Sequence, residues 1–171
     1  MKKKSRYLFE TDLKWIEDSK GNLTSRIIHD PIKVATPKIF KGVQGGMWSP
    51  EHLLISSVSS CFMTTCLFYA KQKGLPVSAF DCEAIGQVEL RNGKLAFIEI
   101  NIYPKIGIEK QEWHDKAIEV IELTKQNCLI TKALSVGVFY HPQIEIIPRI
   151  PLKKTKAIND RREPLLLKQA T

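Results

Sequence analysis

One long helix sets the strongest limit on how this chain can fold. Residues 52–70 contain no Asp, Glu, Lys or Arg, and they follow directly on Ser49-Pro50-Glu51. Ser is a preferred N-cap, Pro is favoured at the first helical position, and a carboxylate in the first turn complements the helix dipole. Lys71 and Lys73 precede Gly74-Leu75-Pro76, which is a stop signal. The sequence therefore predicts one helix of roughly 24 residues.

The uncharged run is long enough to cross a membrane, but its composition argues against a span. Hydroxyl side chains recur along it at Ser56, Ser57, Ser59, Ser60, Thr64 and Thr65. A helix that is apolar on most sides and yet carries these groups is typical of the centre of a globular protein. We predict a central helix that is buried nearly all round, and no membrane partner.

Short strands are predicted on both sides of this helix. Residues 7–35 form apolar or alternating runs separated by turn signals, as in an antiparallel meander. Residues 79–103 alternate over two strands joined at Asn92-Gly93, and Asn-Gly is the preferred two-residue hairpin turn. The fold class is therefore α+β, with antiparallel sheets packed on a long helix.

The C-terminal half adds a second helix and a predicted hairpin. Residues 109–125 place apolar side chains three and four positions apart, which predicts an amphipathic helix. A shorter helical element is expected to begin at Cys128. Residues 135–140 and 143–147 read as two strands of a closing hairpin. We assign residues 1–147 to a single domain and residues 148–171 to a basic, Pro-containing arm.

The net charge of +8 is concentrated at the two ends of the chain. Residues 1–6 carry four basic side chains, and residues 148–171 carry seven basic against two acidic ones, so the body between them has a net charge of −1. No aromatic residues interleave with the charges of 148–171, as nucleic-acid contacts would favour. We therefore expect solvated tails and no nucleic-acid partner, although a weak RNA or anionic-surface contact by the arm stays open.

The four cysteines are Cys61, Cys66, Cys82 and Cys128. The N-terminus, Met-Lys-Lys-Lys-Ser-Arg, does not resemble a signal peptide, so we predict a cytoplasmic protein with reduced thiols. No CxxC or CxxH spacing occurs, and we expect neither a metal site nor a cofactor. A cysteine inside an apolar helix is more often a packing residue than a nucleophile, and this applies to Cys61, Cys66 and Cys82. Cys128 differs, because exposed backbone N–H groups at a helix start favour a thiolate.

The order of several short motifs resembles the OsmC/Ohr family, the osmotically induced and organic hydroperoxide resistance proteins. The resemblance spans residues 7–147. The motifs that carry it are Thr36-Pro37, residues 42–46, Ser49-Pro50-Glu51-His52-Leu53-Leu54, Ser60-Cys61-Phe62, Gly74-Leu75-Pro76-Val77 and Cys128-Leu129-Ile130-Thr131-Lys132-Ala133-Leu134. Each motif alone is weak, and their shared order and spacing identify the chain as similar to this family.

The resemblance implies an intertwined homodimer with two long central helices wrapped by sheets. It also implies a thiol-dependent peroxidase of organic hydroperoxides or hydrogen peroxide. Cys61 would attack the peroxide and become a sulfenic acid, Cys128 would resolve it to a disulfide, and a dithiol reductant would reopen that bond. Glu51 matches the family's carboxylate. Plausible apolar wall residues are Phe40, Met47, Trp48 and Phe62.

Two features of the sequence complicate this expectation. Glu51 lies ten residues before Cys61, roughly 15 Å along the helix, so it can serve the thiol only from a partner subunit or else merely stabilises the helix start. Where the family's peroxidases have an Arg near the first turn, this chain has Ser19-Lys20, with Arg26 further along. Lys lacks the planar fork of Arg. Leu129 also stands where family members commonly have Pro.

An alternative function follows from these departures. The chain would keep the fold and an apolar interfacial pocket, and it would bind a small hydrophobic or thiol-bearing ligand without turnover. The two hypotheses differ in whether Cys61 is acidic and in whether it is coupled to Cys128.

Overall fold

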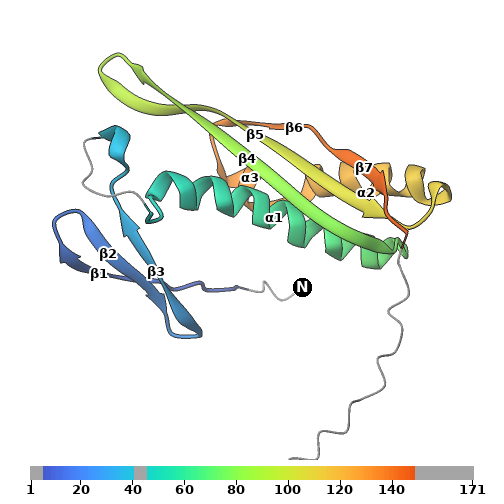
Figure 1. The fold of residues 1–171 in the computed structure, drawn as a ribbon, viewed down its shortest axis with the longest axis horizontal. Coiled ribbons are helices and arrows are strands. Elements are labelled where there is room, and N and C mark those ends of the chain that lie inside the picture. The colour runs from blue at the N-terminus through green and yellow to red at the C-terminus, as the bar shows by residue number, and fades with distance from the viewer. Residues whose placement is uncertain (1–5, 41–45, 149–171) are drawn as a thin grey trace, which may run out of the picture.

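The computed structural model describes residues 6–40 and 46–148 (Figure 1). The predicted arm lies outside these residues except for Pro148. The Lys residues at the N-terminus and residues 42–45 of the 42–46 motif also lie outside them. The predicted meander is confirmed. It comprises β1 (Asp12–Glu17), β2 (Lys20–Ser25) and β3 (Ile28–Ala35), which form an antiparallel sheet in this order. A 3₁₀ turn, η1 (Lys38–Phe40), follows the sheet.

The long helix α1 spans Pro50–Lys73 and has the predicted caps. The Ser49 hydroxyl accepts a hydrogen bond from the backbone N–H of His52 at 3.3 Å. At the other end Gly74 takes a left-handed conformation, with φ of +65°, and donates its N–H to the last turn. A side chain with a Cβ is strained in this conformation, so Gly74 ends the helix.

The predicted hairpin is confirmed and is longer than its sequence pattern. β4 (Val77–Arg91) pairs antiparallel with β5 (Lys94–Ile108) along the length of both strands. Asn92 and Gly93 have φ angles of +52° and +75°, as a type I′ turn requires. β5 is the central strand of the main sheet and β4 lies at its edge, and α1 crosses one face of this sheet (Figure 1).

The second helix is confirmed, and it begins with a 3₁₀ turn. η2 (Gln111–Trp113) leads into α2 (His114–Asn127), and a break at Cys128 separates α2 from the short α3 (Leu129–Ala133).

The predicted closing hairpin is wrong. β6 (Gly137–Tyr140) and β7 (Gln143–Ile146) do not pair with each other; both run parallel to β5 along successive parts of its length. The two residues between them are His141 and Pro142, and neither is suited to a tight two-residue turn. His141 donates its N–H to the Ile102 carbonyl at 2.9 Å, whereas Pro142 has no N–H to donate. The chain therefore continues in the same direction after a short break.

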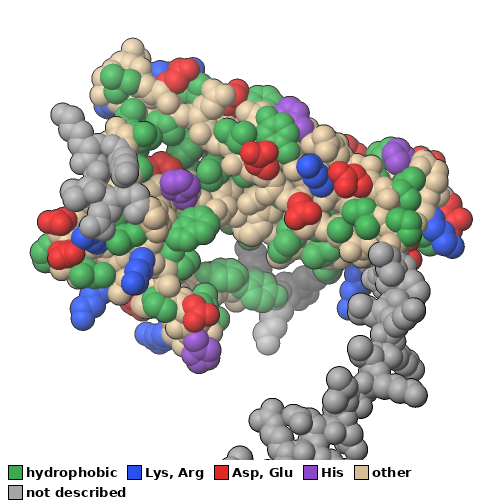
Figure 2. Space-filling view, in the orientation of Figure 1, with side chains coloured by type: hydrophobic (Ala, Val, Ile, Leu, Met, Phe, Trp, Pro, Cys, Tyr) green, Lys and Arg blue, Asp and Glu red, His purple; other side chains and the backbone are tan. Residues whose placement is uncertain are grey.

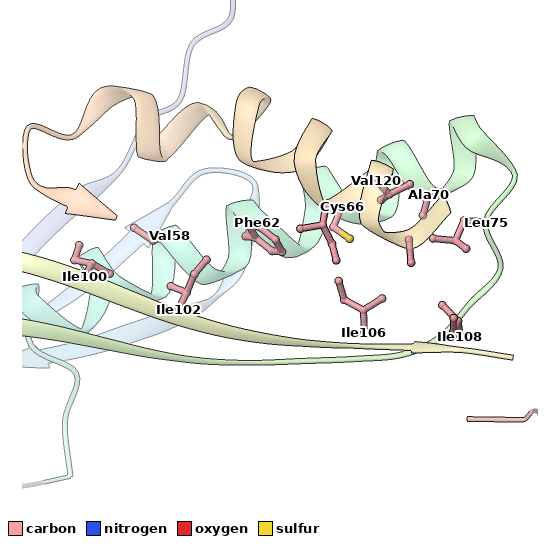
Figure 3. Packing of buried hydrophobic residues seen from close by; sticks show 12 residues of the cluster. Val58, Phe62, Cys66, Ala70, Leu75, Ile100, Ile102, Ile106, Ile108 and Val120 are labelled. Atoms are coloured by element: carbon pink, nitrogen blue, oxygen red, sulfur yellow. The ribbon is translucent and has the colours of Figure 1, made fainter. Parts of the chain in front are cut away.

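The core lies between one face of α1, the inner face of β5 and α2 (Figure 3). From α1 it takes residues four positions apart, Val58, Phe62, Cys66 and Ala70. From β5 it takes residues on one side of the strand, Ile100, Ile102, Ile106 and Ile108, and from α2 Ala117, Val120 and Ile121. The face of α1 formed by every fourth residue therefore packs on the face of β5 formed by every second residue.

The expectation that α1 is buried nearly all round is wrong for the single chain. Leu67 and Phe68 on the side away from the core are exposed, Phe68 by 61%. Among the described residues, α1 is the helix long and apolar enough to cross a membrane, yet its buried stripe belongs to the core shared with β5 and α2. The single chain therefore leaves apolar side chains of α1 exposed to solvent.

The core makes a direct prediction about stability. Ile102 is fully buried, so Ile102→Ala should lower the free energy of unfolding by about 2–5 kcal/mol, through lost burial and the cavity left behind. Ile27→Ala, at an 88% exposed position, is the matched control and should change it by no more than about 0.5 kcal/mol. Urea denaturation measures both. Equal effects of the two substitutions would contradict this packing.

Candidate functional site

Cys61 and Cys128 are brought together by the packing of α3 against α1. Cys61 is on α1, half-buried, one position before the core residue Phe62. Cys128 is the N-cap of α3 and is fully buried. Each thiol influences the proton affinity of the other. The fold therefore places within interaction range two thiols that lie 67 positions apart in the sequence.

Cys61 is the more acidic of the two thiols. Burial acts to raise its pKa, but hydrogen bonding outweighs burial and holds the pKa below the ordinary value for a thiol. The contributing groups, in order of size, are the Cys128 thiol, the backbone N–H of Ile130, the Thr65 hydroxyl and the backbone N–H of Leu129. Thr65 Oγ1 lies 4.0 Å from Cys61 Sγ, one turn further along α1. Donors directed at sulfur favour the thiolate, which is the nucleophilic form.

Cys128 has the opposite character, which corrects one expectation. Burial raises its pKa most, and its interaction with Cys61 raises it further, against smaller lowering effects of the backbone N–H and hydroxyl of Thr131. The prediction that the start of α3 favours a thiolate on Cys128 itself is therefore wrong. The N–H groups of Leu129 and Ile130 serve Cys61 instead. The pair at neutral pH is an acidic Cys61 beside a protonated Cys128.

Two residues of this site were not predicted from the sequence, although Thr131 lies within the motif that begins at Cys128. Thr131 donates its hydroxyl to the Cys128 carbonyl at 3.1 Å. Tyr140, at the end of β6, hydrogen-bonds with Thr131, and its ring lies 5.6 Å from that of Phe62. Burial raises the pKa of Tyr140, and the nearby thiols raise it further, so the phenol keeps its proton. Tyr140 reaches the site only because β6 pairs with β5 in parallel, which the predicted hairpin would not have shown.

Cys66 and Cys82 are placed as packing residues. Cys66 is fully buried in the core, where burial raises its pKa to about 11 despite a hydrogen bond with Thr124. Burial also raises the pKa of Cys82 on β4. Thiols with raised pKa values are poor nucleophiles at neutral pH.

Glu51 lies apart from the two thiols, in the first turn of α1. It lines a pocket of about 250 Å³ with apolar side chains of η1, α1, β4 and β5, among them Phe40, Ile55 and Phe97. Its Oε2 atom is buried and has no hydrogen-bond partner among the described residues. A buried carboxylate oxygen without a partner is costly, so this oxygen requires a donor beyond the described residues.

Neither candidate for the missing Arg pairs with Glu51. Lys20 forms an ion pair with Glu17 at 2.7 Å, and Arg26 is paired with Glu10 at 3.5 Å on the exposed surface. Lys20 does lie at the helix start, where it lines a pocket with Pro50.

The predicted wall residues do not form one wall. Phe40 lines the Glu51 pocket, whereas Met47 and Trp48 line a separate hollow with His52. Phe62 is a core residue and lines neither pocket. Within residues 6–40 and 46–148, no group of three or more His, Cys, Asp or Glu side chains is arranged to hold a metal ion.

Comparison with known proteins decides the family. Residues 43–140 match the family model described as OsmC-like protein, and this segment is more than half of the chain. The chain belongs to the OsmC-like family. A search of curated protein sequences found no match.

Solved structures agree with this assignment at the level of the fold. An OsmC-like protein of unknown function from Vibrio cholerae superimposes with a TM-score of 0.68 at 15% identity, over 79% of this chain and 99% of that one. An OsmC-like protein from Mycoplasma pneumoniae gives 0.66 at 19% identity, over 85% and 99%. An organic hydroperoxide resistance protein from Elizabethkingia anophelis gives 0.65 at 18% identity, over 84% and 100%. These superpositions show a shared OsmC-like fold.

The geometry of this OsmC-like protein predicts which thiol reacts first. Because its pKa is lowered, Cys61 should reach half-maximal alkylation by iodoacetamide at a lower pH than the other three thiols. Thr65→Val removes one donor and should shift the Cys61 profile to higher pH. Thr64→Val is the matched control, because its hydroxyl bonds only to backbone carbonyls, those of Ser60 and Cys61. Equal rates at Cys61 and Cys82, measured by mass spectrometry, would contradict the assignment.

Proposed function

We propose that this OsmC-like protein is a thiol-dependent peroxidase that reduces organic hydroperoxides or hydrogen peroxide. The Cys61 thiolate attacks the terminal oxygen of the peroxide, the O–O bond breaks, and the alkoxide leaves as an alcohol after taking a proton. Cys61 is then a sulfenic acid. The Cys128 thiol condenses with it, which forms a disulfide and releases water. A dithiol reductant returns both cysteines to thiols.

The observation that carries this proposal is the unequal pair of thiols. A peroxidatic cysteine must be a thiolate, and a resolving cysteine must be adjacent to it and remain reduced until the sulfenic acid has formed. Cys61 has the lowered pKa, and Cys128 has the raised pKa at a fully buried position beside it. Solved proteins of this fold that are named organic hydroperoxide resistance proteins support the same reaction class.

We further propose that the active form is a homodimer. Exposed apolar side chains lie on α1 and on the N-terminal sheet; they include Phe68, Trp15, Leu13 and Ile28. That sheet stands apart from the main sheet (Figure 1), and hydrophobic side chains face the hollow between the two (Figure 2). A second copy seated there would cover this surface. It would also bring its own helix start, with Glu51, to the Cys61 of the first copy.

The peroxidase cycle predicts a specific disulfide. One equivalent of cumene hydroperoxide added to the reduced protein should form a Cys61–Cys128 bond, mapped by mass spectrometry, with hydrogen peroxide tested in parallel. Cys61→Ser should abolish peroxide consumption. Cys128→Ser should consume one equivalent and accumulate the sulfenic acid, which dimedone traps. Cys82→Ser is the matched control and should turn over normally.

Slow, scattered oxidation of all four cysteines would contradict the cycle. That result would favour the alternative function, a binding protein of the same fold for a small hydrophobic or thiol-bearing ligand.

The position of Glu51 predicts complementation between subunits. In a heterodimer of Glu51→Gln and Cys61→Ser chains, the intact Cys61 would face the intact Glu51 of the partner. Co-expressed and purified with two different tags, this heterodimer should keep about half of the wild-type turnover, whereas each mutant homodimer should be at least tenfold slower. An inactive heterodimer would place Glu51 and Cys61 of one chain in the same site, whereas a Glu51→Gln homodimer with wild-type turnover would remove Glu51 from the reaction.

A further inference from the structure

The Thr131 side chain interacts with both the carbonyl and the thiol of Cys128. Its hydroxyl donates to the Cys128 carbonyl at 3.1 Å, and it also lowers the pKa of the Cys128 thiol. Its oxygen takes part in a hydrogen bond with the Tyr140 phenol. The hydroxyl has only one proton to donate, so it serves either the carbonyl or the sulfur at a given moment.

The two steps of the proposed cycle make different demands on Cys128. In the reduced protein the Cys128 S–H is a donor to the Cys61 thiolate, and its proton must stay. After the sulfenic acid has formed, Cys61 carries no charge, and Cys128 must attack through sulfur while its proton leaves with the sulfenic oxygen as water. Negative charge then develops on a fully buried sulfur, which needs a donor.

We infer that Thr131 and Tyr140 are positioning residues for the resolving step, in which the Thr131 hydroxyl turns from the Cys128 carbonyl to the Cys128 sulfur. Thr131 has the required place, one turn after the N-cap on the short helix α3. Tyr140 interacts with the Thr131 hydroxyl through its phenol oxygen and so fixes the position of the Thr131 side chain. This inference rests on the proposed peroxidase function and concerns its second step.

The place of Tyr140 is fixed by packing on two sides. Its ring lies against that of the fully buried Phe62, at 5.6 Å between centroids, and the Lys125 ammonium lies 5.9 Å from the ring centre. Tyr140 ends β6, which is paired in register with β5 at Ile102. The phenol is therefore held against Thr131 by the sheet and the core, and Tyr140→Phe keeps this packing while it removes the hydroxyl that contacts Thr131.

The experiment separates the two steps by rapid mixing of the full chain with cumene hydroperoxide. Sulfenic acid formation is followed by dimedone trapping in quenched samples, and disulfide formation by mass spectrometry of the same samples. Thr131→Val should slow disulfide formation about tenfold more than it slows sulfenic acid formation, since one hydrogen bond to the reacting sulfur is lost. Thr131→Ser should restore the rate. Tyr140→Phe should show a smaller effect on the same step.

The pH dependence of disulfide formation distinguishes this role of Thr131 from a merely structural one. Loss of the donor raises the pKa of Cys128, so the disulfide-forming rate of Thr131→Val should reach half its maximum at a higher pH than in the wild type. Thr65→Val is the matched control and should affect the first step instead. Equal slowing of both steps, or no rescue by Ser, would overturn the inference while the peroxidase function stands. Absence of any sulfenic acid in the wild type would overturn the function itself.

Discussion

The site depends on one contact, the packing of the first turn of α3 against the middle of α1. This contact directs the backbone N–H groups of Leu129 and Ile130 and the thiol of Cys128 at the sulfur of Cys61. Burial alone would keep Cys61 protonated, and these donors reverse its effect. The same contact buries Cys128 and raises its pKa, so one piece of local structure gives the two thiols opposite properties. The break between α2 and α3 at Cys128 makes this arrangement possible, because it frees the N–H groups of the next residues.

Local signals in the sequence were sufficient for most of the fold. The Ser49 cap, the Gly74 stop and the Asn92-Gly93 turn each act through their own backbone conformation, and all three elements formed as predicted. The order of β6 and β7 could not be predicted, because parallel pairing with β5 is a long-range choice with no local turn signal. Tyr140 was missed for the same reason, whereas Thr131 lies in the Cys128 motif and its role depends on contacts within the folded site. Cys61 and Cys128 stood out through family resemblance, whereas their pKa values depend on three-dimensional contacts.

Two features of the single chain support the proposed homodimer. One is the apolar face of α1 and the N-terminal sheet, and the other is the buried Glu51 oxygen with no partner among the described residues. A helix rises about 1.5 Å per residue, so Glu51 cannot reach the Cys61 of its own α1. Lys20, near the helix start, already pairs with Glu17.

The most direct test of this account is the titration of each cysteine in the reduced protein, followed by the 13C shift of Cβ in a sample labelled at cysteine. The account predicts that Cys61 titrates first, below the ordinary pKa of a thiol, that Cys128 and Cys82 titrate above that value, and that Cys66 titrates near 11. In Cys128→Ser the Cys61 titration should keep part of its shift, because the N–H groups remain. A Cys61 that titrates at or above the ordinary value, or after Cys128, would contradict the account.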